Sequence, residues 1–267
     1  MPIVSKKSSN TLEVQNAAKT LYANIRFMSP DNPVSTIVIT SSVPNEGKSF
    51  TSIELAKAIA TSGNTVLLVE ADMRKRTLAG ALDIHAPHGV YGVLTEEVTL
   101  REAVMPTPTR NMYFLDSEPN IPNPADIISS RRYARLVEIM KKSFDYVIFD
   151  TPPVGTFVDA AILSTLVDGT VLTLKNASTK RADVVHAYDQ LVKAGARILG
   201  ICATFCENTS SEYYYAYYNQ KGERVHRNDR QEDQLPMPAD LPARRSATHA
   251  RGNSASFPAV ERRESRN

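Results

Sequence analysis

The sequence of 267 residues lacks the features that mark several large classes of protein. No apolar run approaches the roughly 20 residues that a membrane-spanning helix needs, and no apolar segment of signal-peptide length follows the polar residues 1–10. Only two cysteines are present, Cys202 and Cys206, without a second pair or nearby histidines that would suggest zinc. We therefore expect a soluble, cytoplasmic protein with reduced thiols.

A strong excess of charge is also missing. The 31 basic and 29 acidic residues leave a net charge of +2, so the total gives no reason to expect nucleic acid as a partner. Hydrophobic residues make up 42% of the chain, which is enough for the core of one α/β domain with appendages.

Short apolar runs alternate with helical stretches over most of the chain. The runs lack polar alternation, which is typical of a parallel sheet that is covered on both faces. The sequence therefore predicts a doubly wound α/β fold, in which ligands bind beyond the carboxyl ends of the strands. Strands are predicted at 35–40, 65–69, 112–115, 146–149, 170–174 and 197–203, and helices at 12–27, 48–61, 131–142, 159–166 and 181–193.

The first predicted strand leads into a segment that resembles a phosphate-binding loop. It matches the pattern G-x-x-x-x-G-K-S/T at Gly47, Lys48 and Ser49, with Ser42 in place of the first glycine. Backbone N–H groups of such a loop hold phosphate oxygens, the lysine adds positive charge, and the serine hydroxyl can bind Mg²⁺. The alternative is an ordinary polar loop with a helix-capping serine. We expect a nucleotide to contact Ser42, Pro44, Asn45, Glu46, Gly47, Lys48, Ser49 and Phe50.

Two acidic motifs follow later strands. The second predicted strand leads into Glu70 and Asp72, which an extended chain would place on one face, and the run at 146–149 leads into Asp150. Carboxylates at such positions can hold Mg²⁺ and accept a proton from an attacking hydroxyl. Alone, either motif could be a strand that ends in a helix cap or turn. Together with the loop they predict a magnesium-nucleotide site of P-loop NTPase type, with Ser49, Asp72 and Asp150 around the metal.

Tyrosines are concentrated near the end of the chain, where five of the eleven fall within six residues. A strand would place them on both of its faces, and no apolar run follows that could bury them, although a structural role stays open. Residues 219–267 hold few aliphatic side chains and mixed charges, which predicts disorder. The cluster consists of Tyr213, Tyr214, Tyr215, Tyr217 and Tyr218.

These segments together resemble the bacterial tyrosine kinases (BY-kinases) that regulate capsule and exopolysaccharide synthesis. The resemblance covers residues 16–220. The matching pieces are the phosphate loop at 41–49, the acidic motif that ends in Asp72-Met73-Arg74, the segment 149–153 around Asp150 and the tyrosine cluster, with lesser similarity at 20–27 and 123–130.

The resemblance implies an autokinase that uses ATP and Mg²⁺ and transfers the γ-phosphate to cluster tyrosines of a neighbouring subunit in a homo-oligomeric ring. Lys48, Asp72 and Asp150 would carry the reaction, with Glu70 as the proton acceptor. A separate transmembrane activator that controls polysaccharide chain length would recruit the protein to the inner face of the cell membrane, and a cognate tyrosine phosphatase is also implied.

The chain then divides into four parts. These are an N-terminal arm with a helix (1–34), a P-loop kinase domain (35–207), the tyrosine cluster (208–220) and a disordered tail (221–267). The mild positive charge of the tail could contact an anionic membrane or an acidic partner.

Three places depart from the family's pattern. Glu70 stands where the family usually has aspartate, and a displacement on the order of 1 Å can cost about a hundredfold in rate. Asn16, Lys19 and Tyr22 replace the charged residues of the oligomerisation pattern E-x-x-R-x-x-R, so two charges for intersubunit pairs are missing. Thr204 stands where relatives often have an asparagine near the adenine.

Two other functions stay open. Septum-positioning and plasmid-partition ATPases share the expected fold, but their signature lysine five residues before the P-loop lysine is Val43 here. A non-catalytic subunit that signals by nucleotide occupancy is the other alternative, and the departures at Glu70 and in the N-terminal helix favour it. The basic run Arg74-Lys75-Arg76 could steer phosphate or a partner, or could be a solvated helix start.

Overall fold

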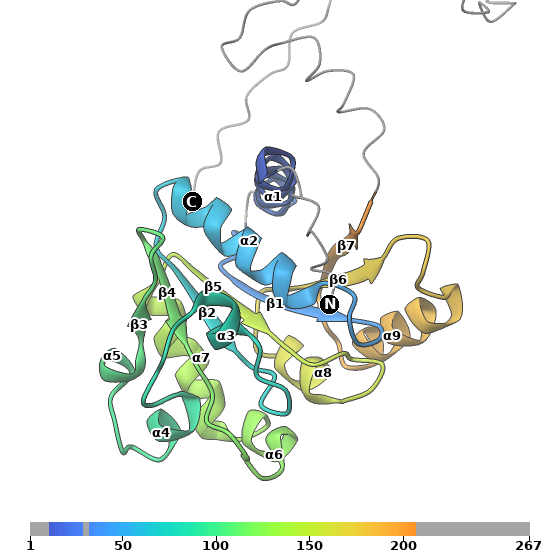
Figure 1. Cartoon of the computed structure of the whole chain (residues 1–267). Helices are drawn as coiled ribbons and strands as arrows, with labels where there is room; N and C mark the ends of the chain where they lie inside the picture. The colour runs from blue at the N-terminus through green and yellow to red at the C-terminus, as the bar shows by residue number, and fades with distance from the viewer. Residues whose placement is uncertain (1–10, 29–31, 207–267) are drawn as a thin grey trace, which may run out of the picture. The chain divides into compact units, whose positions relative to one another are not determined.

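The computed structural model describes residues 11–28 and 32–206. The predicted tyrosine cluster and the predicted disordered tail lie outside the described residues. Within this part of the chain, one seven-stranded sheet has the order β3-β4-β2-β5-β1-β6-β7 (Figure 1). All neighbouring strands are parallel except β3 and β4. The strands are β1 Thr36–Ser41, β2 Val66–Glu70, β3 Met105–Pro106, β4 Met112–Leu115, β5 Tyr146–Asp150, β6 Gly169–Lys175 and β7 Ile198–Thr204.

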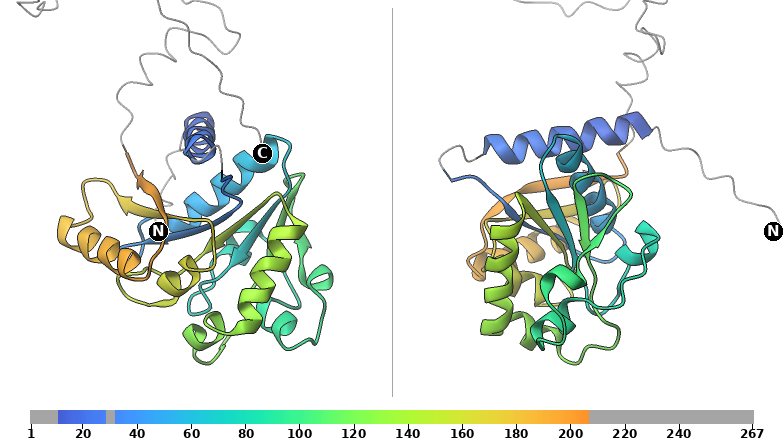
Figure 2. Two further views of the ribbon diagram at one scale, coloured as in Figure 1. Left: turned by 180° about the vertical axis from the view of Figure 1, so that it is seen from behind. Right: turned by 90° about the vertical axis from the view of Figure 1, so that its left-hand side faces the viewer.

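Helices cover both faces of the sheet, which confirms the doubly wound α/β fold (Figures 1 and 2). Helices α1 and α2 lie on one face, and α7, α8 and α9 lie on the other. The helices are α1 Thr11–Phe27, α2 Lys48–Thr61, α3 Leu78–Leu82, α4 Val90–Leu94, α5 Leu100–Ala103, α6 Pro124–Ile128, α7 Arg131–Ser143, α8 Asp159–Ser164 and α9 Arg181–Lys193.

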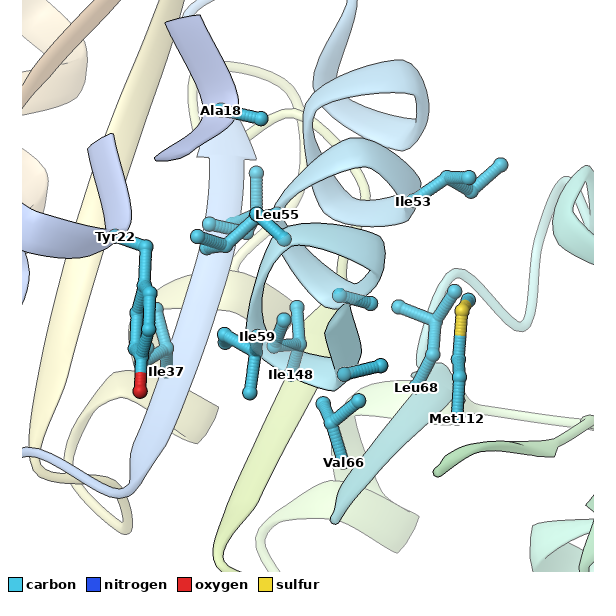
Figure 3. Close-up of a cluster of buried hydrophobic side chains, with 14 of the residues drawn as sticks. Ala18, Tyr22, Ile37, Ile53, Leu55, Ile59, Val66, Leu68, Met112 and Ile148 are labelled. Carbon is cyan, nitrogen blue, oxygen red and sulfur yellow. The ribbon is translucent and has the colours of Figure 1, made fainter. Parts of the chain in front are cut away.

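The inner strands of the sheet are largely buried because helices cover both of its faces. Every residue of β1 and β2 is buried, as the unbroken apolar runs predict. One apolar cluster lies between the sheet and the α1–α2 layer, and it includes Ile37 of β1, Ile59 of α2 and Ile148 of β5 (Figure 3). This packing fixes α2, and with it the loop at its N-terminus, over the sheet.

The N-terminal helix α1 packs against α2 as part of the same core. Tyr22 is buried in the cluster that contains Leu55 of α2 (Figure 3). Ile25 belongs to the same cluster. The Tyr22 hydroxyl donates to the Tyr146 hydroxyl at 3.3 Å and accepts a hydrogen bond from Asn64 at 3.0 Å. Burial and the contact with Tyr146 raise the pKa of Tyr22. The residue in the place of an oligomerisation arginine is therefore buried within its own chain.

Asp168 connects the amino ends of β1 and β6 through hydrogen bonds, at the edge of the sheet opposite the phosphate loop. One carboxylate oxygen accepts the N–H groups of Ser35 and Thr36, each at 3.0 Å, and the Ser35 hydroxyl at 2.9 Å. The other oxygen forms an ion pair with Lys141 of α7. Two strands and one helix thus meet at a single side chain.

Candidate active site

The phosphate loop between β1 and α2 turns at two residues with left-handed backbone. Asn45 has φ 65° and Gly47 has φ 82°. A Cβ on Gly47 would also come within 3.1 Å of the Thr204 side chain, which follows from the closeness of β7 to the loop. Glycine at position 47 is therefore favoured by both the backbone angle and the space.

The backbone of Ser42, which stands where the loop pattern has its first glycine, lies against a glycine of another segment. Ser42 is buried, and a Cβ on Gly155 would approach the Ser42 carbonyl oxygen to 2.2 Å. Gly155 lies in the segment that follows β5. The close approach of two backbones beside the site is thus made possible at position 155.

The carboxylate of Glu46 holds the first turn of the loop from inside. One oxygen accepts the N–H groups of Ser42 at 2.8 Å and Val43 at 3.1 Å, and the other accepts the Thr179 hydroxyl. Thr204, which stands where relatives often have an asparagine near the adenine, donates its hydroxyl to the Glu46 carbonyl oxygen at 2.8 Å. Because the first two N–H groups are engaged in this way, phosphate oxygens would bind N–H groups later in the loop.

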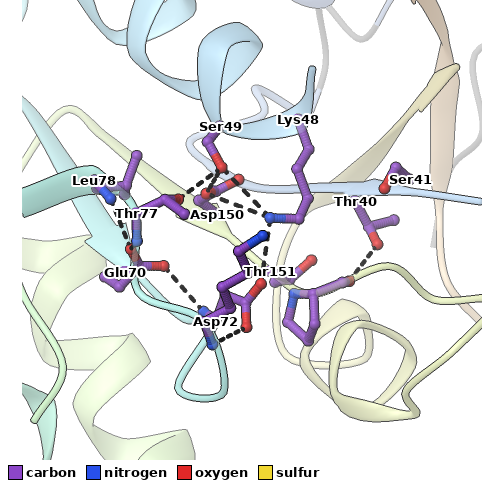
Figure 4. Close-up of polar contacts among 12 residues, drawn as sticks. Thr40, Ser41, Lys48, Ser49, Glu70, Asp72, Thr77, Leu78, Asp150 and Thr151 are labelled. Carbon is purple, nitrogen blue, oxygen red and sulfur yellow. Dashed lines mark hydrogen bonds and ion pairs between the residues drawn. The ribbon is translucent and has the colours of Figure 1, made fainter. Parts of the chain in front are cut away.

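The lysine and the predicted metal-site residues converge at the carboxyl ends of β1, β2 and β5 (Figure 4). Lys48 Nζ lies 3.3 Å from Asp72 Oδ2 and 3.9 Å from Asp150 Oδ2. The Ser49 hydroxyl donates to Asp150 Oδ2 at 2.5 Å, and the Ser52 hydroxyl donates to Asp150 Oδ1 at 3.1 Å. Burial raises the pKa of Asp150 to about 6, although Lys48 and the two hydroxyls favour the charged carboxylate.

Glu70 ends β2 directly opposite Asp150 of β5 and is fully buried. Its carboxyl oxygens accept the backbone N–H groups of Asp72 at 3.2 Å, Thr77 at 2.7 Å and Leu78 at 2.9 Å (Figure 4). Burial and then the charge of Asp150 raise the pKa of Glu70 to about 8, while the N–H groups of Leu78 and Thr77 lower it. Glu70 is therefore part of the site, and its hydrogen bonds run to the segment that follows β2.

Two of the three cations in the basic run after β2 are paired with buried carboxylates. Arg74 Nη2 lies 3.2 Å from Asp159 Oδ2. Arg76 forms an ion pair with Asp116, and this contact raises the pKa of the guanidinium. These pairs connect the basic run to the chain after β4 and to the start of α8.

Sequence reasoning missed Thr77, Asp116 and Asp159. Asp116 directly follows the apolar run of β4, which is the same signal that identified Asp150, so this signal could have found it. Thr77 and Asp159 begin short helices, where no strand end or loop pattern marks them.

The oxygen donors of the site fit a magnesium ion that is held together with phosphate. Ser49 Oγ lies 3.1 Å from Thr77 Oγ1, and it also contacts the Asp150 carboxylate (Figure 4). Hard oxygen donors suit Mg²⁺, which proteins bind through one or two carboxylates plus substrate phosphates. In residues 11–28 and 32–206, no group of three or more His, Cys, Asp or Glu side chains could hold a metal ion. Ser49 Oγ and the Asp150 carboxylate would hold such an ion together with phosphate oxygens.

The parallel sheet, the phosphate loop and the cluster of lysine and carboxylates define a P-loop nucleotide-binding protein. Residues 34–177 match the AAA domain family. The septum site-determining protein MinD of Pyrococcus horikoshii, solved with Mg-ADP, shares the fold with a TM-score of 0.55 at 23% identity, over 62% of this chain and 68% of that one.

Tyrosine-protein kinases match more of the chain. YwqD of Bacillus subtilis is 34% identical over 203 residues, which cover 76% of this chain and 85% of YwqD. CpsD of Streptococcus agalactiae is 32% identical over 220 residues, 82% of this chain and 93% of CpsD. The chain belongs to the family of bacterial tyrosine-protein kinases, and it is an enzyme of that class.

Solved structures agree with this assignment. The chimerical protein CapA2B2 is 30% identical with a TM-score of 0.67, over 74% of this chain and 85% of that one. The BceF tyrosine kinase domain is 31% identical with a TM-score of 0.63, over 71% and 76%.

Proposed function

We propose that this chain is an autokinase that uses Mg²⁺-ATP to phosphorylate the tyrosine cluster of a neighbouring copy. The observation that supports it best is the meeting of Lys48, Ser49, Asp72 and Asp150 in one site of a chain from the tyrosine-protein kinase family. We further propose that the phosphorylation regulates capsular or extracellular polysaccharide synthesis, as the family resemblance implies. The acceptors would be Tyr213, Tyr214, Tyr215, Tyr217 and Tyr218.

In the proposed reaction, the phenolic oxygen of a tyrosine forms a bond to the γ-phosphorus of ATP. The bond from that phosphorus to the β,γ-bridging oxygen breaks, and ADP leaves. Lys48 would bind the γ-phosphate and stabilise its charge as it transfers, next to the N–H groups at the start of α2. Mg²⁺, held through Ser49, Asp72 and Asp150, supplies charge neutralisation when bound. The phenolic proton passes to a carboxylate, and Glu70 and Asp72 are the candidates nearest the site.

We also propose that a transmembrane activator recruits the chain to the inner face of the cell membrane, and that a tyrosine phosphatase reverses the modification. The support for both is the family resemblance. Among the residues that the structure describes, no helix is long and apolar enough to span a bilayer.

The decisive experiment mixes two full-length variants with Mg²⁺-ATP. One carries Lys48→Met and keeps its tyrosines, and the other keeps Lys48 and has all five cluster tyrosines changed to phenylalanine. Mass spectrometry separates the two clusters because their sequences differ. We expect phosphotyrosine on the Lys48→Met chain in the mixture only, and expect the cytoplasmic segment of an activator to increase it.

Other results would favour other functions. Phosphotyrosine on the unchanged chain alone, and not in the mixture, would show transfer within one chain. ATP turnover without phosphotyrosine would favour an ATPase of the partition type, and nucleotide binding without turnover would favour a regulatory subunit.

A further inference from the structure

Thr77 stands in the N-cap position of α3, yet its hydroxyl is used elsewhere. In the described part of the chain, no hydrogen bond joins the Thr77 side chain to the first turn of α3. Thr99 at α5 behaves as an N-cap threonine usually does, and its oxygen accepts the Glu102 N–H at 3.3 Å. The Thr77 hydroxyl instead lies 3.1 Å from Ser49 Oγ (Figure 4). Thr77 therefore faces the phosphate loop at the serine that would hold Mg²⁺.

Glu70 binds the backbone N–H groups at the start of α3. Its Oε2 accepts both the Thr77 N–H at 2.7 Å and the Leu78 N–H at 2.9 Å, and its Oε1 accepts the Asp72 N–H at 3.2 Å (Figure 4). These bonds fix the two ends of the segment between β2 and α3 to one fully buried side chain. The Thr77 hydroxyl, which makes no side-chain cap bond to α3, contacts Ser49.

The length of the glutamate matters for this arrangement. An aspartate at position 70 would place its carboxylate one methylene further back, about 1.5 Å from the present oxygens. Oxygens at that distance would lie beyond hydrogen-bond range of the Thr77 and Leu78 N–H groups unless the segment moved. The departure from the family's usual aspartate thus coincides with a contact that aspartate could not make in this geometry.

We propose that Thr77 is a further residue of the magnesium-nucleotide site and that Glu70 is the residue that positions it. The Thr77 hydroxyl adds a second neutral oxygen donor beside Ser49. Glu70 acts here through the hydrogen bonds that it accepts, a role distinct from that of the proton acceptor named among the candidates above. The inference rests on the proposed function only in that the site binds Mg²⁺ and a nucleotide.

The test measures how much Mg²⁺ strengthens the binding of a non-hydrolysable ATP analogue to the full chain, by calorimetry with and without the metal. We expect Thr77→Val and Glu70→Asp each to reduce this gain by about 10- to 100-fold, as loss of a metal-site partner commonly does. Thr77→Ser should retain it, since the hydroxyl remains. Glu70→Gln should lose less than Glu70→Asp, because the amide oxygen can still accept two N–H groups. Thr99→Val, the same change at an ordinary cap, should keep the full gain.

Two further measurements separate this role from its rivals. The double variant Glu70→Asp/Thr77→Val should lose no more of the affinity gain from Mg²⁺ than the more affected single variant loses, because both changes remove the same contact of Thr77 with Ser49. Thermal unfolding identifies any variant that fails to fold. If the Glu70 variants fail to fold, the comparison of Thr77→Val with Thr77→Ser still tests the inference.

A full gain in Thr77→Val would overturn the inference. A second combination of results would also overturn it. In that combination both Glu70→Asp and Glu70→Gln keep the full gain, but Glu70→Gln loses phosphotransfer, which identifies Glu70 as a proton acceptor. An unchanged chain that shows the gain but never forms phosphotyrosine would count against the proposed function alone.

Discussion

Gly155 lies so close to the phosphate loop that its lack of a side chain bears on nucleotide binding. A Cβ there would come within 2.2 Å of the Ser42 carbonyl oxygen, well inside van der Waals contact. The obstructing atom belongs to the backbone, so a change of side-chain rotamer cannot relieve the clash. The contact joins the phosphate loop to the segment after β5, and β5 itself ends at Asp150.

We expect Gly155→Ala to displace the phosphate loop and to weaken binding of an ATP analogue by at least about tenfold, since misplacements on the order of 1 Å are costly in such sites. Calorimetry on the folded variant measures this. Gly80→Ala is the matched control, because a Cβ at Gly80 would meet no heavy atom within 4 Å. That control should bind as the unchanged chain does and gain up to about 1 kcal/mol in stability from better helix propensity. Unchanged affinity in Gly155→Ala would contradict the prediction.

Among the secondary-structure elements, the helices of several turns and the strands with an unbroken apolar run were predictable. Helices α2 and α9 and strand β4 have the predicted bounds, and β1, β2, β5, β6 and β7 differ by one residue at their ends. Strand β3 and helices α3 to α6 have five residues or fewer, too short to show a period. Helix α4, for example, begins where the distant Glu118 carboxylate accepts the N–H groups of Gly89, Tyr91 and Gly92.

The candidate site likewise has residues that the sequence predicts and contacts that it does not. The meeting of Lys48, Asp72 and Asp150 could be predicted because Lys48 belongs to the loop pattern, each aspartate stands at or just after a strand end, and parallel strands bring such ends together. The contact of Thr77 with Ser49 could not, because it joins residues 28 positions apart through a short helix start. Contacts of this kind depend on tertiary structure and leave no local pattern.

Helix α1 offers a prediction at the scale of one element. Tyr22→Arg restores an arginine of the family's oligomerisation pattern, but it places a charge in the apolar cluster beneath α1 and removes the hydrogen bond with Asn64. We expect a loss of about 2–4 kcal/mol in the free energy of unfolding. Urea unfolding measures it, with the exposed Lys19→Arg as a control that should stay within about 0.5 kcal/mol. If Tyr22→Arg is as stable as the unchanged chain, the burial of Tyr22 does not hold α1 in place.

For the molecule as a whole, Asp168 connects stability to pH. Burial alone would raise the pKa of Asp168, but Lys141 and the N–H groups of Ser35 and Thr36 outweigh burial and hold the pKa well below its usual range. The unfolded chain therefore binds this proton more tightly than the folded one. The contribution of the carboxylate is present above about pH 4 and is lost as the pH falls towards the folded pKa.

We expect Asp168→Asn to lower the free energy of unfolding by about 1–3 kcal/mol at pH 7, since a charged acceptor of several hydrogen bonds becomes a neutral one. The difference from the unchanged chain should shrink as the pH falls below about 4. Urea unfolding at pH 7, 5 and 3 measures both chains. A difference that stays constant over this range would show that the carboxylate charge has no such role.

The contact of Thr204 with the phosphate loop joins the edge of the sheet to the nucleotide site. The Thr204 hydroxyl lies within hydrogen-bond distance of the carbonyl oxygens of Glu46 and Leu174, and the Glu46 side chain accepts the N–H groups of Ser42 and Val43. A displacement of β7 would therefore be transmitted to the backbone that binds phosphate, so the edge strand and the nucleotide site are mechanically coupled.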